Sequence, residues 1–230
     1  MNPSSELGML YFFLIIFAIA NISAEVHGRT VTVQFISLPK IADAEPIELL
    51  VAEDKYITID APCQDISKPY RVDKCKQWKV GKYKDADDGT LKFIEYGSVK
   101  ALDTRHQLVI LIRKGETNAE GFEVIVTGCG IAKFGGGSFL LVNGSDNDVA
   151  AKLGDEECTI SAGKQSIVKP EIKNGTHTCH AMFSYRKNDK MKPFFSSKWP
   201  VNSHARGLIC FYTDSKTGSL KMHTIRDFLD

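Results

Sequence analysis

The sequence has little that would build a helical domain or a charged binding face. Across its 230 residues, no long stretch carries the 3.6-residue apolar period of an amphipathic helix. Its 29 basic and 28 acidic residues leave a net charge of +1, so the basic face that nucleic-acid binding requires is missing. Beyond the N-terminus, no segment is apolar enough to cross a membrane. These absences favour an all-β protein with no nucleic-acid partner and no membrane span in its mature chain.

Motifs that mark a catalytic centre are also missing. The sequence has no Gly-x-Ser-x-Gly of a nucleophile elbow and no His-Glu-x-x-His of a zinc protease. Several glycines fall between Gly128 and Gly137, but they lead into a strand pattern and not into the helix that a phosphate-binding loop opens. We therefore expect no catalytic residue and no cofactor. An enzyme would need a site assembled from residues distant in sequence.

One segment of the sequence occurs twice. Residues 58–69 and 159–170 align without a gap and share seven of twelve residues, where average residue usage predicts about one. The apolar run Leu108–Ile112 matches Leu208–Tyr212 at nearly the same separation. Two distant matches at one separation indicate the duplication of a domain of about 100 residues, because insertions otherwise accumulate in surface loops.

Short strand patterns separated by turn sequences make up both copies. Residues 30–35 alternate polar and apolar side chains, as a half-buried strand does. Leu108–Ile112 is apolar throughout, which predicts a strand covered on both faces. Strands at this spacing predict an all-β fold of two tandem β-sandwich units. Further strands are expected at residues 47–51, 56–59, 77–83, 91–96, 122–126, 138–142, 149–153, 157–160, 166–169, 179–185, 191–199, 208–212 and 220–225.

A glycine-rich connector is expected between the two units. We place the first β-sandwich at residues 28–115, the connector with its one strand at 116–137, and the second β-sandwich at 138–230. The glycines make the connector a natural hinge. We expect a loop at residues 62–75 and a hairpin turn at 173–176, where Asn and Gly tolerate positive φ.

The first 24 residues predict export. They contain one charge, Glu6, and an apolar stretch from Leu7 to Ala20 that is short for a membrane span. Small residues follow, so we expect a signal peptide at residues 1–24, cleaved after Ala24. A basic N-terminal region is missing, which leaves an N-terminal membrane anchor as the alternative. The mature protein is therefore expected to be periplasmic or extracellular.

All six cysteines lie in the part expected to be exported, where disulfides form. Many connectivities are possible for six cysteines, and the sequence does not choose among them. Cys63 and Cys75 are the nearest pair within one expected unit, so we predict a disulfide between them that closes the loop at 62–75. Cys158 and Cys210 are also consistent with small apolar core residues on strands.

The strongest local candidates for a metal site are His177, Cys179, His180 and Met182. They supply every ligand type of an exported copper centre. On a strand, however, His177 and Cys179 face one side and His180 and Met182 face the other, so four ligands would not converge on one ion. A copper- or zinc-binding protein, or an enzyme built around His177, Cys179 and His180, is kept as the alternative function.

Two other features have two interpretations each. Asn143 and Asn174 begin glycan-acceptor motifs, which matter only if the host glycosylates its proteins. Phe194, Phe195 and Trp199 would form a binding platform if they were exposed, although aromatic residues on strands more often pack in a core.

The second copy resembles part of a known family. Phe139–Asn143, a polar turn, Val149–Gly154, Ala162–Gln165 and Leu208–Tyr212 are similar to the second half of the periplasmic alginate O-acetylation adaptor family, and to exported bacterial families of unknown function with tandem β-domains. The likeness covers mainly residues 138–215 and transfers no site residue. That family is non-catalytic and brings acetylation enzymes together. The resemblance implies an exported, non-catalytic binding or scaffolding protein with a protein or polysaccharide partner in the cell envelope or extracellular space.

Overall fold

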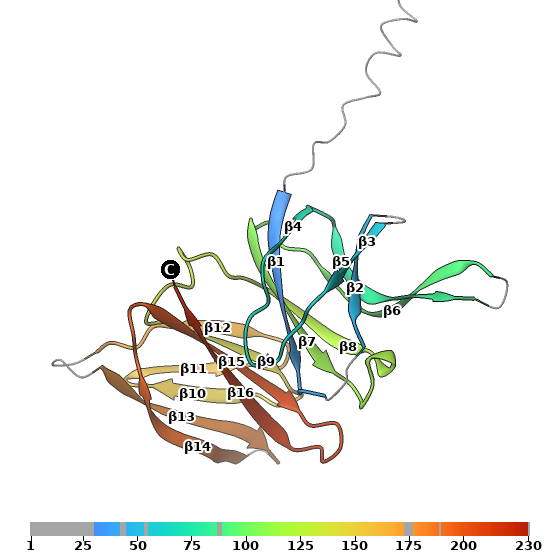
Figure 1. Ribbon diagram of the computed structural model, residues 1–230. Helices are drawn as coiled ribbons and strands as arrows, with labels where there is room; N and C mark the ends of the chain where they lie inside the picture. Colours follow the sequence, from blue (N-terminus) through green and yellow to red (C-terminus); the bar gives the residue numbers. More distant parts are fainter. Residues whose placement is uncertain are drawn as a thin grey trace, which may run out of the picture.

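The computed structural model describes residues 30–41, 45–52, 55–86, 89–172, 177–188 and 190–229. In these residues the chain is nearly all β-strand, and its one helical segment is a single 3₁₀ turn, η1 (Asn118–Glu120). Figure 1 shows that the strands form two β-sandwiches. The predicted all-β fold of two tandem sandwich units is therefore confirmed. The expected signal peptide and the expected turn at 173–176 lie outside the described residues.

The first sandwich consists of two four-stranded sheets. One has the strand order β4-β1-β7-β8, and the other has the order β3-β2-β5-β6. The strands are β1 (Thr30–Leu38), β2 (Ile47–Ala52), β3 (Lys55–Ile59), β4 (Tyr70–Asp73), β5 (Gln77–Asp85), β6 (Leu91–Lys100), β7 (His106–Arg113) and β8 (Phe122–Gly128).

The second sandwich is built in the same way. Its sheets have the orders β12-β9-β15-β16 and β11-β10-β13-β14. The strands are β9 (Phe139–Gly144), β10 (Val149–Leu153), β11 (Glu156–Ile160), β12 (Gln165–Val168), β13 (Thr178–Lys187), β14 (Lys190–Pro200), β15 (Ala205–Thr213) and β16 (Leu220–Phe228).

The two sandwiches share one topology. Each strand of the first sandwich has a counterpart eight strands later in the chain, at the same place in its sheet. In both, the first strand runs parallel to the seventh, as β1 does to β7 and β9 to β15, while the other ladders are antiparallel. The apolar runs matched in the sequence occupy the same central strands. This correspondence supports the predicted duplication.

β4 lies within residues 62–75, which we expected to be a loop. It pairs antiparallel with the first half of β1. Before β4, the hydroxyl of Ser67 accepts a hydrogen bond from the N–H of Phe35 at 2.8 Å, so a side chain takes the place of a ladder bond. The prolines and polar residues of this segment do not indicate a strand in the sequence. The strand forms because it pairs with β1, which is distant in the sequence.

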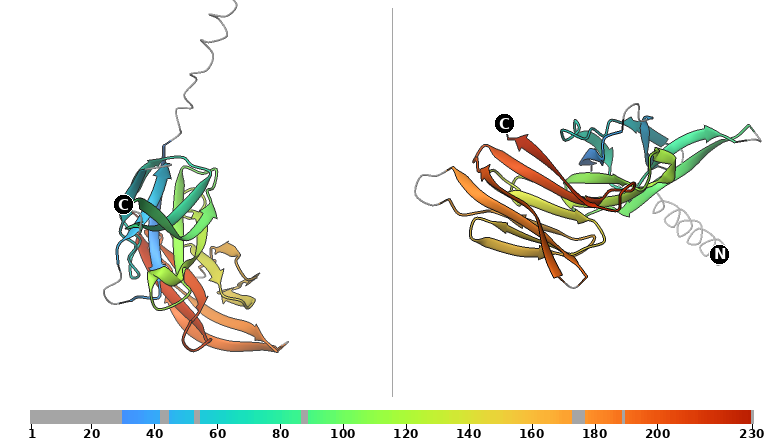
Figure 2. Two further views of the ribbon diagram at one scale, coloured as in Figure 1. Left: turned by 90° about the vertical axis from the view of Figure 1, so that its right-hand side faces the viewer. Right: turned by 90° about the horizontal axis from the view of Figure 1, so that it is seen from below.

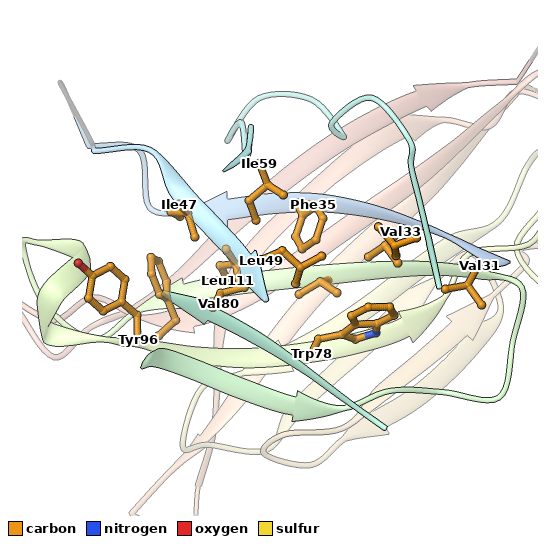
Figure 3. Packing of buried hydrophobic residues seen from close by; sticks show 13 residues of the cluster. Val31, Val33, Phe35, Ile47, Leu49, Ile59, Trp78, Val80, Tyr96 and Leu111 are labelled. Carbon is orange, nitrogen blue, oxygen red and sulfur yellow. The ribbon is translucent and has the colours of Figure 1, made fainter. Parts of the chain in front are cut away.

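Three hydrophobic layers separate the four sheets. The first fills the first sandwich around Phe35 and Trp78, and Figure 3 shows how its side chains meet between the sheets. The third fills the second sandwich around Phe183 and Phe211. The sheets therefore stack in the order β3-β2-β5-β6, β4-β1-β7-β8, β12-β9-β15-β16 and β11-β10-β13-β14.

The middle layer joins the two sandwiches, which lie side by side in Figure 2. Both faces of β7 are covered: Val109 and Leu111 face the first layer, and Leu108 and Ile110 face the middle one. The prediction from the unbroken apolar run of β7 is thereby confirmed. Apolar burial of this kind stabilises at about 25 cal/mol per Å². The middle layer comprises Ile36, Leu38, Leu108, Ile110, Ile112, Cys129, Phe134, Leu140, Val142, Leu208, Cys210, Tyr212 and Ile225.

The expected connector packs tightly against both sandwiches. Its one strand, β8, pairs with β7 and completes the sheet of the first sandwich. Farther along, Cys129 and Phe134 are buried in the middle layer. A Cβ on Gly136 would lie 1.7 Å from the carbonyl oxygen of Ser203, so this glycine permits a close backbone approach. The glycine-rich stretch is therefore packed against its neighbours in this structure, and its role as a hinge stays a prediction.

Candidate functional site

The four metal candidates do not converge on one point. Cys179 is buried in the core of the second sandwich, while His180 and Met182 lie on the exposed face of β13. His177 precedes that strand, and His180 Nε2 lies 3.0 Å from the Oγ of Ser196. Strand alternation separates these side chains, as expected. Among the described residues, no three His, Cys, Asp or Glu side chains are grouped closely enough to hold a metal ion.

The predicted disulfide between Cys63 and Cys75 is wrong, because all six cysteines are free. Pro62, next to Cys63, accepts a hydrogen bond from the N–H of Ser37 near the end of β1. Cys75 instead follows β4, whose last residue pairs with Thr30 at the start of β1. The two cysteines thus lie at opposite ends of β1, about 20 Å apart at about 3.3 Å per strand residue. A disulfide cannot span that distance.

Asn143, the first residue of one expected glycan acceptor, is a structural residue. Its side chain is fully buried. Its Nδ2 donates to the carbonyl oxygens of Asn147 and Ile160 at 2.7 and 2.8 Å, and its Oδ1 accepts from the N–H and the hydroxyl of Ser145. The folded chain therefore offers no free amide for a sugar at this position. Asn174 lies outside the described residues.

Phe194, Phe195 and Trp199 pack in the core of the second sandwich. Their ring centroids lie 6.3, 5.7 and 5.4 Å from that of Phe183. All three are partly buried against this core. The interpretation as core residues is correct, and these rings do not form an open platform.

A different group of aromatic residues lies on the outer face of the first sandwich. Tyr56 of β3, Tyr83 of β5 and Phe93 of β6 form an aromatic row. The ring centroids of Tyr56 and Tyr83 are 4.6 Å apart, and those of Tyr83 and Phe93 are 5.2 Å apart. Ile57 packs against the core, so strand alternation turns its neighbour Tyr56 outward. Tyr56 is 40% exposed.

The aromatic row continues onto the hairpin of β5 and β6, which projects from the body of the molecule (Figure 1). Leu91 and Ile94 are 56% and 45% exposed on this hairpin. Alternation places Ile94 on the opposite face from Phe93, so the hairpin is apolar on both faces. We call the aromatic row together with Leu91 and Ile94 the hairpin surface. Exposed apolar side chains gathered on an outer edge strand are typical of a contact with another molecule.

Ion pairs border the hairpin surface. Lys79 lies 3.4 Å from Glu95, and Lys82 lies 3.0 Å from Glu45. The Lys82 ammonium group lowers the pKa of the Glu45 carboxyl, and Glu45 in turn raises the pKa of Lys82. An apolar centre with a charged border is the usual anatomy of a protein interface.

The described residues of the corresponding hairpin in the second sandwich, β13 and β14, form no such row. Both hairpins contain a bulge in their second strand, at Tyr96 of β6 and at Phe194 of β14. Counted from the bulge, Tyr83 corresponds to Arg186, and Phe93 corresponds to Met191. The same topology therefore forms without these aromatic residues, which indicates that the row is not a requirement of the fold.

Sequence reasoning missed the aromatic row, because its members come from three strands and each looks like an ordinary strand residue. The internal repeat, however, could have indicated the aromatic row. A comparison of the two hairpin sequences shows Tyr83 and Phe93 in the first copy where the second has charged and flexible residues.

The fold is that of a tandem β-sandwich protein, and the hairpin surface is an exposed apolar patch on its first sandwich. No family model matches the chain, and no curated protein matches it. The described part of the chain includes no helix that is long and apolar enough to cross a membrane.

Proposed function

We propose that this protein is an exported, non-catalytic binding or scaffolding protein that holds a protein partner on its hairpin surface. The observation that carries the proposal is the row of Tyr56, Tyr83 and Phe93, which runs from β3 onto the projecting hairpin of β5 and β6, and which has no counterpart among the described residues of the second hairpin. Tyr and Phe are enriched in the cores of protein interfaces, where they supply large apolar contacts.

The geometry of the rings favours a protein partner over a polysaccharide. The ring planes of Tyr56 and Tyr83 are inclined by 33°, and those of Tyr83 and Phe93 by 58°. These rings do not share one plane on which a flat polymer would stack. The aliphatic side chains of Leu91 and Ile94 extend the contact and fit the apolar pockets of a protein surface.

The stack of four sheets suits a scaffolding role. The middle layer fixes the second sandwich against the first, so a partner bound to the hairpin surface would be held at a set distance from the second sandwich. Export is supported by the apolar stretch and the small residues in positions 7–24. The resemblance of the second unit to a non-catalytic envelope adaptor family agrees with this proposal.

The test is affinity capture from an envelope extract with two matched variants. Phe93→Ser removes the centre of the hairpin surface, and Met191→Ser makes the same change at the corresponding position of the other hairpin. We expect one stoichiometric protein to be captured by the wild type and by Met191→Ser, and its recovery to fall at least about tenfold with Phe93→Ser, as for an interface hot spot.

Equal capture by all three proteins would contradict the assignment of the surface. If Phe93→Ser reduced the capture of a polysaccharide and not of a protein, the result would contradict the proposed class of partner. Metal analysis of the purified protein runs in parallel. Stoichiometric copper or zinc that is lost with His180→Ala would overturn the proposal in favour of a metal protein.

A further inference from the structure

The outer edge of β6 is open along the projecting hairpin. β6 ends the sheet order β3-β2-β5-β6, so among the described residues no strand pairs with its other side. Leu91–Glu95 is exposed except for Phe93, which is half-buried. Alternate residues of such an edge strand direct their N–H and C=O groups away from the sheet. This stretch, which we call the open edge, therefore presents backbone groups with which an added strand can pair.

The same strand is covered where it enters the body of the first sandwich. A Cβ on Gly97 would lie 2.9 Å from the carbonyl oxygen of Phe122, and one on Gly121 would lie 2.9 Å from the carbonyl oxygen of Tyr96. The segment that leads into β8 thus comes close to the backbone of β6 from Tyr96 onward. The open edge is therefore limited to the part of β6 that projects with the hairpin (Figure 1).

The second hairpin blocks the same stretch of its edge. β14 also ends its sheet. Counted from the bulge, Pro193 corresponds to Glu95 and Lys192 corresponds to Ile94, and both Pro193 and Lys192 are exposed. Proline has no N–H to donate to a neighbouring strand, and an exposed lysine places a charge on the edge. Both devices keep edge strands from pairing. The two copies therefore share a topology but differ in whether this edge can accept a strand.

The two faces of the open edge differ in chemistry. Leu91 and Phe93 lie on the face of the aromatic row, and alternation places Lys92 and Ile94 on the other face. Lys92 is directly opposite Lys84 in the ladder with β5. A carboxylate on an added strand beside Lys92 would face both ammonium groups, and opposite charges on neighbouring strands favour pairing. The open edge thus suits a strand that is apolar on one face and acidic on the other.

We propose that the protein partner contributes an extended segment of alternating apolar and acidic residues, which adds to the open edge as a further strand of this sheet. Its apolar side chains pack beside Leu91 and Phe93, and its carboxylates lie beside Lys92. Backbone hydrogen bonds give such strand addition its affinity, and the alternate side chains give it selectivity. The inference rests on the proposed function, because it specifies how the hairpin surface is recognised.

Fluorescence anisotropy with labelled peptides tests the chemistry of the added strand. The probe is a short peptide of alternating valine and glutamate. A second peptide has N-methyl groups on its backbone nitrogens, so it keeps the side chains and loses the N–H donors, and a third has lysine in place of glutamate. We expect the probe to bind at least about tenfold more tightly than the N-methylated peptide, and at least about threefold more tightly than the lysine peptide. Equal affinities, or no binding of the probe, would overturn the proposal.

Hydrogen exchange of the backbone amides locates the bound probe. The valine–glutamate peptide should slow exchange in Leu91–Glu95 at least about fivefold and leave exchange in Lys190–Lys192 unchanged. Lys190–Lys192 is the matched control, because it occupies the corresponding stretch of β14. Slower exchange in both stretches, or in neither, would contradict addition to the open edge.

Glu95→Pro gives the open edge the residue that blocks the second hairpin. Proline on an edge strand turns its nitrogen toward solvent, so we infer that the N–H of Glu95 faces the open edge. Glu95→Pro should weaken the valine–glutamate peptide at least about tenfold, whereas Glu95→Ala keeps the N–H and should change the affinity less than about twofold. Both variants remove the ion pair of Glu95 with Lys79, so its loss cannot explain a difference between them. Equal affinities of the two variants would contradict the proposal.

Affinity capture separates this inference from the proposed function. We expect Glu95→Pro to lose the captured protein, as Phe93→Ser does, and Glu95→Ala to keep it. If Phe93→Ser loses the protein and a folded Glu95→Pro retains it, the hairpin surface binds its partner without strand addition, so this inference is wrong and the function stands. If the wild type captures no protein, the function is wrong, and the peptide and hydrogen-exchange measurements still decide whether the open edge accepts a strand.

Discussion

The guanidinium of Arg206 lies over the ring of Phe134, 4.6 Å from its centroid. The same side chain donates to the carbonyl oxygens of Phe134 and Cys129 and pairs with Asp227 at 2.7 Å. Arg206 belongs to β15 of the second sandwich, whereas Cys129 and Phe134 belong to the connector. One buried cation therefore ties the connector to the second sandwich.

Replacement of Arg206 should destabilise the protein strongly. Arg206→Ala leaves the carboxylate of Asp227 and two carbonyl oxygens without their donor, and we expect a loss of about 3 kcal/mol in the free energy of unfolding. Arg186→Ala is the control, because the ion pair of Arg186 with Asp148 at 3.7 Å is exposed; it should cost less than about 1 kcal/mol. Urea unfolding measures both. Equal losses of unfolding free energy in the two variants would show that the buried contacts of Arg206 do not stabilise the protein.

Two glycines of the connector should respond differently to alanine. Gly136→Ala forces a Cβ against the backbone of Ser203, which should cost about 1–3 kcal/mol. A Cβ on Gly130 would meet no neighbouring group within 4 Å, and the φ of Gly130 is not positive, so Gly130→Ala should change stability by less than about 0.5 kcal/mol. Thermal unfolding measures both variants. A hinge would predict small effects at both positions.

Cleavage of the connector should not separate the two sandwiches. Residues 131–133 are exposed, so a protease recognition sequence inserted there is accessible. We expect the two fragments to elute together from a sizing column in native buffer, because the middle layer buries apolar side chains from both. They should separate in urea. Separation in native buffer would contradict the packing of the middle layer.

Alanine should act in opposite directions at two buried polar residues, Ser37 of β1 and Asn143 of the corresponding strand β9. Asn143→Ala leaves buried groups of Asn147, Ile160 and Ser145 without partners, and should cost about 2–3 kcal/mol. Ser37→Ala removes a buried hydroxyl that has no partner among the described residues, and should stabilise the protein by up to about 1 kcal/mol. Urea unfolding measures both variants. Destabilisation by Ser37→Ala would mean that the hydroxyl has a partner.

Stability should fall at high pH because of buried thiols. Burial raises the pKa of Cys210 above its ordinary value of 9.0. Above about pH 9 the unfolded chain loses the thiol proton while the folded chain keeps it, so each pH unit costs about 1.4 kcal/mol for this thiol. Cys210→Val should remove that part of the loss and leave stability at pH 7 nearly unchanged. Urea midpoints at pH 7 and pH 10 test this, and parallel losses in both proteins would contradict it.

Local patterns predicted much of the fold. The strand expected at Val149–Leu153 coincides with β10, and the apolar run Leu108–Ile112 correctly indicated a strand covered on both faces. These predictions succeed because side-chain alternation and apolar runs record which faces of a strand are buried. The repeat predicted two units of one topology, since both copies keep the same strand order.

Features that depend on long-range pairing were not predictable in this way. The parallel pairing of β1 with β7 brings together residues far apart in the sequence. The antiparallel pairing of β1 with β4 likewise places Cys63 and Cys75 at opposite ends of β1, although they are close in the sequence. We interpreted the glycines around Gly136 as flexible. Composition alone does not show whether a glycine makes the backbone flexible or lets another segment pack closely against it.

The middle layer also has the form of a homodimer interface. Ile36 on one side corresponds to Val142 on the other, and Leu108 corresponds to Leu208, so equivalent strands of both copies supply equivalent side chains to it. Such a self-complementary contact is what two identical subunits form across a two-fold axis. The covalent link makes association intramolecular, with an effective concentration in the millimolar range. Pairing of the sandwiches is thus insensitive to dilution, and each copy is free to change its sequence without losing its partner.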